Sequence, residues 1–97
     1  MASRRSLKKD IDFLLSLVLE ECFYVLDEYP ESDKEKVMET VRKVIAAHRE
    51  LRLRVNHING KDDPRLVKAY LRKVVSDLYT TANNALEDIS RLIKKSA

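Results

Sequence analysis

Turn-forming residues are scarce in this chain and fall in only two places. Its 97 residues include a single glycine, Gly60, and two prolines, Pro30 and Pro64. Strands joined by hairpins would need turn residues roughly every ten positions, so the composition favours long helices and predicts an all-α fold. Interruptions at residues 29–30 and 59–64 divide the chain into three helices, which we predict at residues 7–28, 33–58 and 64–94.

The two interruptions also carry specific helix-end signals. The segment from Ser32 to Glu35 has the pattern of a capping box, with Ser32 as the N-cap. Asn59-Gly60 is typical of a helix C-terminus, and Asp63-Pro64 is typical of an N-cap and first helical residue. Because such connections are short, consecutive helices should be antiparallel. This predicts one domain, residues 1–97, folded as an up-down-up three-helix bundle with long helices.

Each predicted helix has an apolar face suited to a shared core, judged at about 100° per residue. The first helix contributes Ile11, Leu14, Leu15, Val18, Leu19, Cys22, Val25, Leu26 and Tyr29. The second carries a heptad seam of Val37, Val41, Val44, His48, Leu51, Val55 and Ile58. The third contributes Val67, Tyr70, Leu71, Val74, Val75, Leu78, Ala82, Ala85, Ile89, Leu92 and Ile93. Alanines in the middle of the third face predict close packing against the first helix.

The first helix carries more apolar surface than one core face needs. Phe13, Leu17 and Tyr24 form a second, narrower stripe on its far side. Either other parts of the same fold cover this stripe, or it contacts another subunit, since exposed aromatic patches often mark interfaces. We predict that these three residues form the interface of a homodimer, with another protein as the alternative partner.

Charge is unevenly distributed along the predicted bundle. The end that holds the start of the first helix, the end of the second and the start of the third has twelve basic and five acidic side chains, a balance of +7, whereas the opposite end has −4. The alternative function is therefore binding of nucleic acid or another polyanion through this basic end, with Arg49, Arg65 and Arg72 as candidates. A solvated charged surface is the simpler interpretation, because this end has few aromatic side chains.

His48 is the one titratable residue predicted to be buried, because it lies on the heptad seam. We expect its ring to hydrogen-bond to Tyr70 or to a group of the first helix near Leu14. The pairs Arg42/His48 and Arg52/His57 resemble the Arg-x(4–6)-His motif of the HEPN helical ribonucleases. Such spacing arises easily in an arginine-rich chain, and Arg42 should point away from the core that His48 faces. We therefore expect no catalysis of that kind.

No other residue pattern indicates a reaction. A carboxylate-bridged metal pair needs Glu-x-x-His sequences, and neither histidine has one. The single cysteine, Cys22, is expected to pack in the core, and no phosphate-binding loop or catalytic triad is apparent. We predict that the protein is not an enzyme and has no cofactor, metal or small-molecule substrate. Carboxylates interrupt the first apolar run, so we predict neither a signal peptide nor a membrane span, and a cytoplasmic location.

The segment LKKDI, residues 7–11, resembles the opening of a group of small uncharacterised all-helical bacterial proteins with no assigned activity. The resemblance covers about the first dozen residues. It implies an all-helical fold and a cytoplasmic location, and it implies no site residues.

Overall fold

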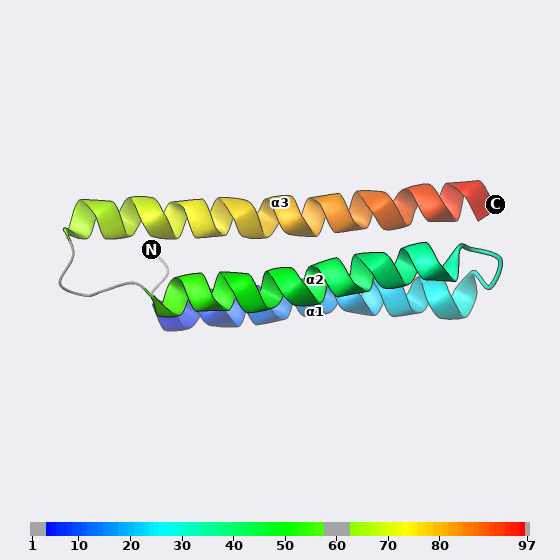
Figure 1. Ribbon diagram of the computed structural model, residues 1–97, viewed down its shortest axis with the longest axis horizontal. Helices are drawn as coiled ribbons and strands as arrows, with labels where there is room; N and C mark the ends of the chain where they lie inside the picture. The colour runs from blue at the N-terminus through cyan, green and yellow to red at the C-terminus, as the bar shows by residue number, and fades with distance from the viewer. Residues whose placement is uncertain (1–3, 58–62, 97) are drawn as a thin grey trace.

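The computed structural model describes residues 4–57 and 63–96, with side chains described as far as residue 93. It contains three helices, α1 (Arg4–Glu28), α2 (Lys34–Asn56) and α3 (Pro64–Ser96). Figure 1 shows that α1 and α3 run in the same direction and that α2 runs antiparallel to both. Each helix packs against the other two, in a rod of 52 × 19 × 15 Å. The predicted all-α up-down-up bundle is confirmed.

The first connection is capped differently from the prediction. Asp33, rather than Ser32, is the N-cap of α2, and its carboxylate accepts a hydrogen bond from the backbone N–H of Lys36 at 3.3 Å. The Ser32 hydroxyl instead donates to the carbonyl of Tyr29 at 2.7 Å. The capping-box prediction is therefore wrong, because the serine is used in the turn after α1 and the adjacent aspartate is equally able to cap.

The second connection agrees with its prediction at the start of α3 but not at the end of α2. The helix α2 ends at Asn56 with His57 as its C-cap, before the predicted end at residue 58. Asp63 precedes α3, and its side chain accepts a hydrogen bond from the backbone N–H of Arg65 at 2.8 Å. Pro64 is the first helical residue, where its missing N–H costs nothing. The turn predicted at Asn59-Gly60, and the core position predicted for Ile58, lie outside the described residues.

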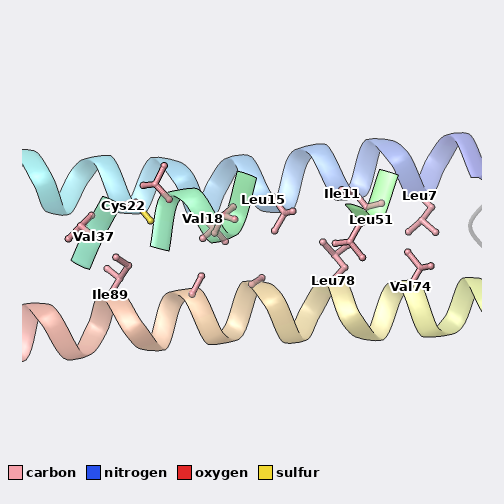
Figure 2. Packing of buried hydrophobic residues seen from close by; sticks show 14 of the residues in the cluster. Leu7, Ile11, Leu15, Val18, Cys22, Val37, Leu51, Val74, Leu78 and Ile89 are labelled. Atoms are coloured by element: carbon pink, nitrogen blue, oxygen red, sulfur yellow. The ribbon is translucent and has the colours of Figure 1, made fainter. Parts of the chain in front are cut away.

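The core is a column of side chains along the axis of the bundle (Figure 2). Leu7 lies near Val74, and Ile11 lies near Leu78 and Leu51. The buried apolar residues are Leu7, Ile11, Leu15, Val18, Cys22, Val25, Val37, Val41, Val44, Leu51, Val55, Leu71, Val74, Leu78, Ala82, Ala85, Ile89 and Leu92. All of these except Leu7 belong to the predicted core faces. The predictions that Cys22 is buried and that the alanines of α3 lie in the core are confirmed.

Tyr70 departs from the predicted core. Its side chain is exposed, although Val67 one turn earlier packs against the core. Tyr70 lies at the edge of the buried face of α3, about 100° around the helix from buried Leu71. Its ring lies 5.9 Å from the guanidinium carbon of Arg54, which is within the range of a cation–π contact. Leu66 is also exposed, about 140° around the helix from Leu71. The apolar pattern at the start of α3 is therefore wider than the face that the other helices bury.

Candidate functional site

The stripe predicted on α1 is not covered by the described part of the fold. Phe13 is 68% exposed, Leu17 44% and Tyr24 51%. Their spacings of four and seven residues place all three on one side of α1, away from its buried face. The helices of the described residues therefore leave the stripe exposed to solvent.

Part of the stripe borders a groove between α1 and α3. The lining of this groove comprises Leu14, Leu17, Val18, Glu20, Glu21, Tyr24 and Leu86. Leu86 is 41% exposed, so α3 adds a second apolar edge to the stripe. We use the term α1/α3 surface for Phe13, Leu17, Tyr24 and Leu86. Sequence reasoning missed Leu86, because its position beside α1 depends on how α3 rotates against that helix.

One aromatic ring of the α1/α3 surface is held by a second ring. Tyr24 and Tyr29 make an edge-to-face contact with their ring centroids 6.3 Å apart and their planes at 68°. Tyr29 in turn packs against the core. This contact restricts the Tyr24 ring before any partner binds, which lowers the ordering cost of an interface.

Carboxylates border the middle and the end of the α1/α3 surface. Glu20 and Glu21 line the groove, and Asp27 and Glu28 follow on the last turn of α1. Lysine precedes the stripe, with Lys9 exposed one turn before Phe13. The surface therefore changes from basic to acidic along α1, with the apolar residues between.

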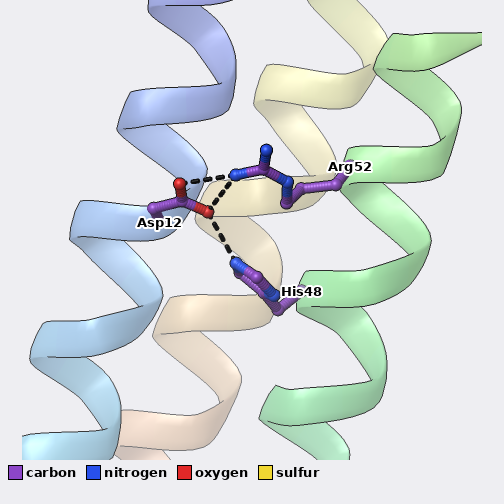
Figure 3. Close-up of polar contacts among 3 residues, drawn as sticks. All are labelled: Asp12, His48 and Arg52. Atoms are coloured by element: carbon purple, nitrogen blue, oxygen red, sulfur yellow. Dashed lines mark hydrogen bonds and ion pairs between the residues drawn. The ribbon is translucent and has the colours of Figure 1, made fainter.

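A second cluster joins α1 to α2 and includes His48. Its Nε2 atom lies 2.6 Å from an oxygen of Asp12 (Figure 3). The same carboxylate accepts from Nη1 of Arg52 at 2.6 Å. An ionised carboxylate can only accept, so Nε2 of His48 donates. Arg52, followed by His48, holds the pKa of the Asp12 carboxyl below its usual range.

The prediction that His48 is buried is wrong, since its side chain is 39% exposed. The ring lies at the edge of the α1–α2 contact, where it bonds to the partly exposed Asp12. Its partner is indeed a group of α1 two residues from Leu14, and Tyr70 is not involved. The cluster links two helices, and its only carboxylate is already shared by two donors.

Arg42 and His48, the first of the two pairs that resemble the HEPN motif, make separate contacts. Arg42 bonds to Glu35, seven residues earlier on α2, at 2.8 Å. His48 bonds to Asp12 of α1 instead. The two side chains therefore do not form a shared site in this structure.

The three arginines proposed for polyanion binding are exposed but lie on two different helices, Arg49 on α2 and the other two on α3. Arg54 faces α3, where it bonds to Asp77 at 2.8 Å. Arg49 lies five residues before Arg54, which turns it about 140° away from that contact. Arg72 lies five residues before Asp77 and is turned similarly away from α2. Arg65, seven residues before Arg72, lies on the same side of α3, so Arg49 is the one that is set apart. The basic end therefore surrounds the rod and does not present these residues on a single face.

The contact between Arg54 and Asp77 forms the main polar link between α2 and α3. Lys73 also bonds to the Asp77 carboxylate, at 2.9 Å. Lys73 and then Arg54 lower the pKa of Asp77. Sequence reasoning missed this link because it depends on the axial offset between α2 and α3. The helical pattern of a sequence does not determine that offset.

In comparisons with protein-family models, curated proteins and solved structures, nothing matches this chain. Within residues 4–57 and 63–96, no helix combines the length and apolar character needed to cross a membrane. The same residues contain no group of three or more His, Cys, Asp or Glu side chains arranged to hold a metal ion.

Proposed function

We propose that this protein is a non-enzymatic, cytoplasmic helical-bundle protein that acts by self-association as a homodimer. The observation that carries the proposal is the uncovered α1/α3 surface. Three helices complete a continuous core without using Phe13, Leu17 or Tyr24. When a partner removes such a cluster of apolar side chains from water, the free energy falls and association is favoured.

Charge complementarity supports a second copy of the chain as that partner. Phe13 and Tyr24 are placed so that an antiparallel two-fold pairing of two α1 helices brings Phe13 of one copy opposite Tyr24 of the other. Lys9 lies four residues before Phe13, and Glu28 lies four residues after Tyr24. The same pairing therefore brings Lys9 opposite Glu28 at both ends of the interface.

Sedimentation equilibrium tests this proposal. The wild-type protein at tens of micromolar is expected to sediment as a dimer, and Leu17→Glu is expected to shift it to a monomer, because it places two buried charges at the centre of the interface. Leu53→Glu is the matched control, since Leu53 lies on α2 and is 47% exposed against 44% for Leu17.

Two outcomes contradict the proposal. A monomeric wild-type protein at these concentrations excludes the homodimer. Dissociation by Leu53→Glu as strong as that by Leu17→Glu places the interface elsewhere. Circular dichroism of both variants checks that the helices remain folded.

Polyanion binding is the second candidate function, supported by the excess of basic side chains at one end of the rod. This function predicts salt-sensitive affinity for RNA or DNA. Fluorescence anisotropy with a labelled oligonucleotide at low ionic strength tests it, together with charge reversal of Arg49, Arg65 and Arg72. Absence of binding at low ionic strength eliminates this candidate.

A further inference from the structure

A second apolar surface lies on α2 and is separate from the α1/α3 surface. Ile45 is 53% exposed and Leu53 is 47% exposed, and the small Ala46 is exposed beside them. Arg42 and Arg49 share this side of the helix. These five residues, which we name the α2 surface, span three helical turns, or about 16 Å at 1.5 Å per residue.

Neither neighbouring helix covers the α2 surface. Arg54 marks the side of α2 that faces α3, and Arg49 is turned about 140° from it. The shallow groove at this place is lined by α2 residues alone: Arg42, Ile45, Ala46, Arg49, Glu50 and Leu53. Because one helix supplies the whole lining, this face can receive a further helix without any change in the bundle.

The charges of the α2 surface differ from those of the α1/α3 surface. Arg49 forms no ion pair within the described part of the chain, and Arg42 bonds only to exposed Glu35. The groove lining thus holds two arginines against one acidic residue, Glu50. Arginine beside exposed aliphatic side chains favours a partner that offers carboxylates next to apolar residues, because arginine pairs well with carboxylates at interfaces. The groove of the α1/α3 surface has Glu20 and Glu21 in its lining and no basic side chain, so it suits the same partner less well.

We infer that the α2 surface binds an acidic amphipathic helix of another protein. The apolar face of that helix packs on Ile45 and Leu53, and its flanking Asp or Glu side chains pair with Arg42 and Arg49. The surface lies on a different side of the bundle from Phe13, Leu17 and Tyr24. The inference therefore does not depend on the proposed homodimer, and each copy in a dimer would keep its own α2 surface free.

Fluorescence anisotropy with a synthetic probe tests this inference. The probe is a labelled helical peptide of about 18 residues with leucines spaced three and four apart and glutamates on both flanks of that face. The matched probe replaces every glutamate with glutamine. The wild-type protein is expected to bind the glutamate peptide about tenfold more tightly than the glutamine peptide at low salt.

Matched variants locate the binding site. Ile45→Glu and Arg49→Glu are each expected to weaken binding of the glutamate peptide about tenfold or more. Lys43→Glu makes the same charge change at an exposed position on another side of α2 and is expected to change the affinity less than about twofold. Leu17→Glu is expected to leave peptide binding intact.

The inference is overturned by any of three results. The first is equal affinity for the glutamate and glutamine peptides, or no binding of either. The second is a loss of affinity in Lys43→Glu as large as that in Arg49→Glu. The third is loss of binding in Leu17→Glu, which would place the peptide on the α1/α3 surface.

Discussion

Asp12 connects two helices through a single carboxylate, which accepts hydrogen bonds from His48 and Arg52. Both donors stabilise the ionised form, so the pKa of Asp12 is lowered in the folded protein. A lowered pKa contributes stability at pH values above the ordinary range of an aspartate. That contribution is lost as the pH falls through the folded-state pKa.

Replacing Asp12 with asparagine is therefore expected to destabilise the protein at neutral pH but little in acid. The loss in the free energy of unfolding at pH 7 should be at most about 1 kcal/mol, because the Asp12 side chain is 45% exposed and solvent screens the pair. The difference from wild type should shrink below about pH 4, where the wild-type carboxyl becomes protonated. Urea denaturation at several pH values measures both quantities.

Asp10→Asn serves as the control, since Asp10 is exposed on the same helix. A pH-independent loss in Asp12→Asn, or an equal loss in Asp10→Asn, would show that the contacts of Asp12 are not responsible.

The cluster of Asp12, His48 and Arg52 could be predicted from the sequence only in part. A helical pattern identifies the face of a residue, but it does not fix the height at which α1 meets α2.

At the scale of the elements, small residues form the middle of the buried face of α3. Ala82 and Ala85 are buried, at 3% and 6% exposure, in the same core as larger side chains of α1 and α2. Their small size lets the neighbouring helices approach α3 at mid-length. A larger residue there must displace a helix or adopt a strained side-chain conformation.

Ala85→Leu is consequently expected to destabilise the protein by about 1–3 kcal/mol through overpacking. Asn84→Leu adds a leucine at the adjacent exposed position and should change the free energy of unfolding by less than about 0.5 kcal/mol. Urea denaturation compares the two variants. A loss in Asn84→Leu that matches Ala85→Leu would contradict close packing at residue 85.

The sequence predicted the three helices and their buried faces well, for an identifiable reason. Gly60, Pro30 and Pro64 mark the connections, and the apolar spacing within each helix is regular. Errors occurred where two local choices compete or where the apolar pattern is wider than the buried face. Ser32 and Asp33 could each cap α2, and Tyr70 lies at the edge of the buried face of α3.

At the scale of the whole molecule, one end of the rod is basic and the other acidic, and this difference favours one relative orientation of two associating rods. A parallel pair would place the basic ends together, whereas an antiparallel pair places each basic end beside an acidic one. Such long-range attraction between exposed charges is screened by salt over about 10 Å at 0.1 M. The proposed dimer should therefore weaken at high ionic strength, even though its apolar contacts do not.

A charge exchange tests this arrangement. Lys9→Glu alone is expected to weaken the dimer about threefold to tenfold, because it places like charges opposite each other at both ends. Adding Glu28→Lys to the same chain should restore most of the affinity, since each lysine again faces a glutamate. Sedimentation at low salt measures the dissociation constants, and failure of the double variant to recover would exclude the antiparallel register.

Because the single thiol of the chain is buried, its rate of chemical modification can report how often the bundle opens. Cys22 is fully enclosed, and burial raises the pKa of its thiol, so the reactive thiolate is scarce in the folded state. A thiol reagent should modify the native chain at least about a thousandfold more slowly than the urea-unfolded chain, because only the small opened fraction reacts. The rate at which the reagent enters would then report how often α1 separates from its neighbours, with no label or engineered residue required.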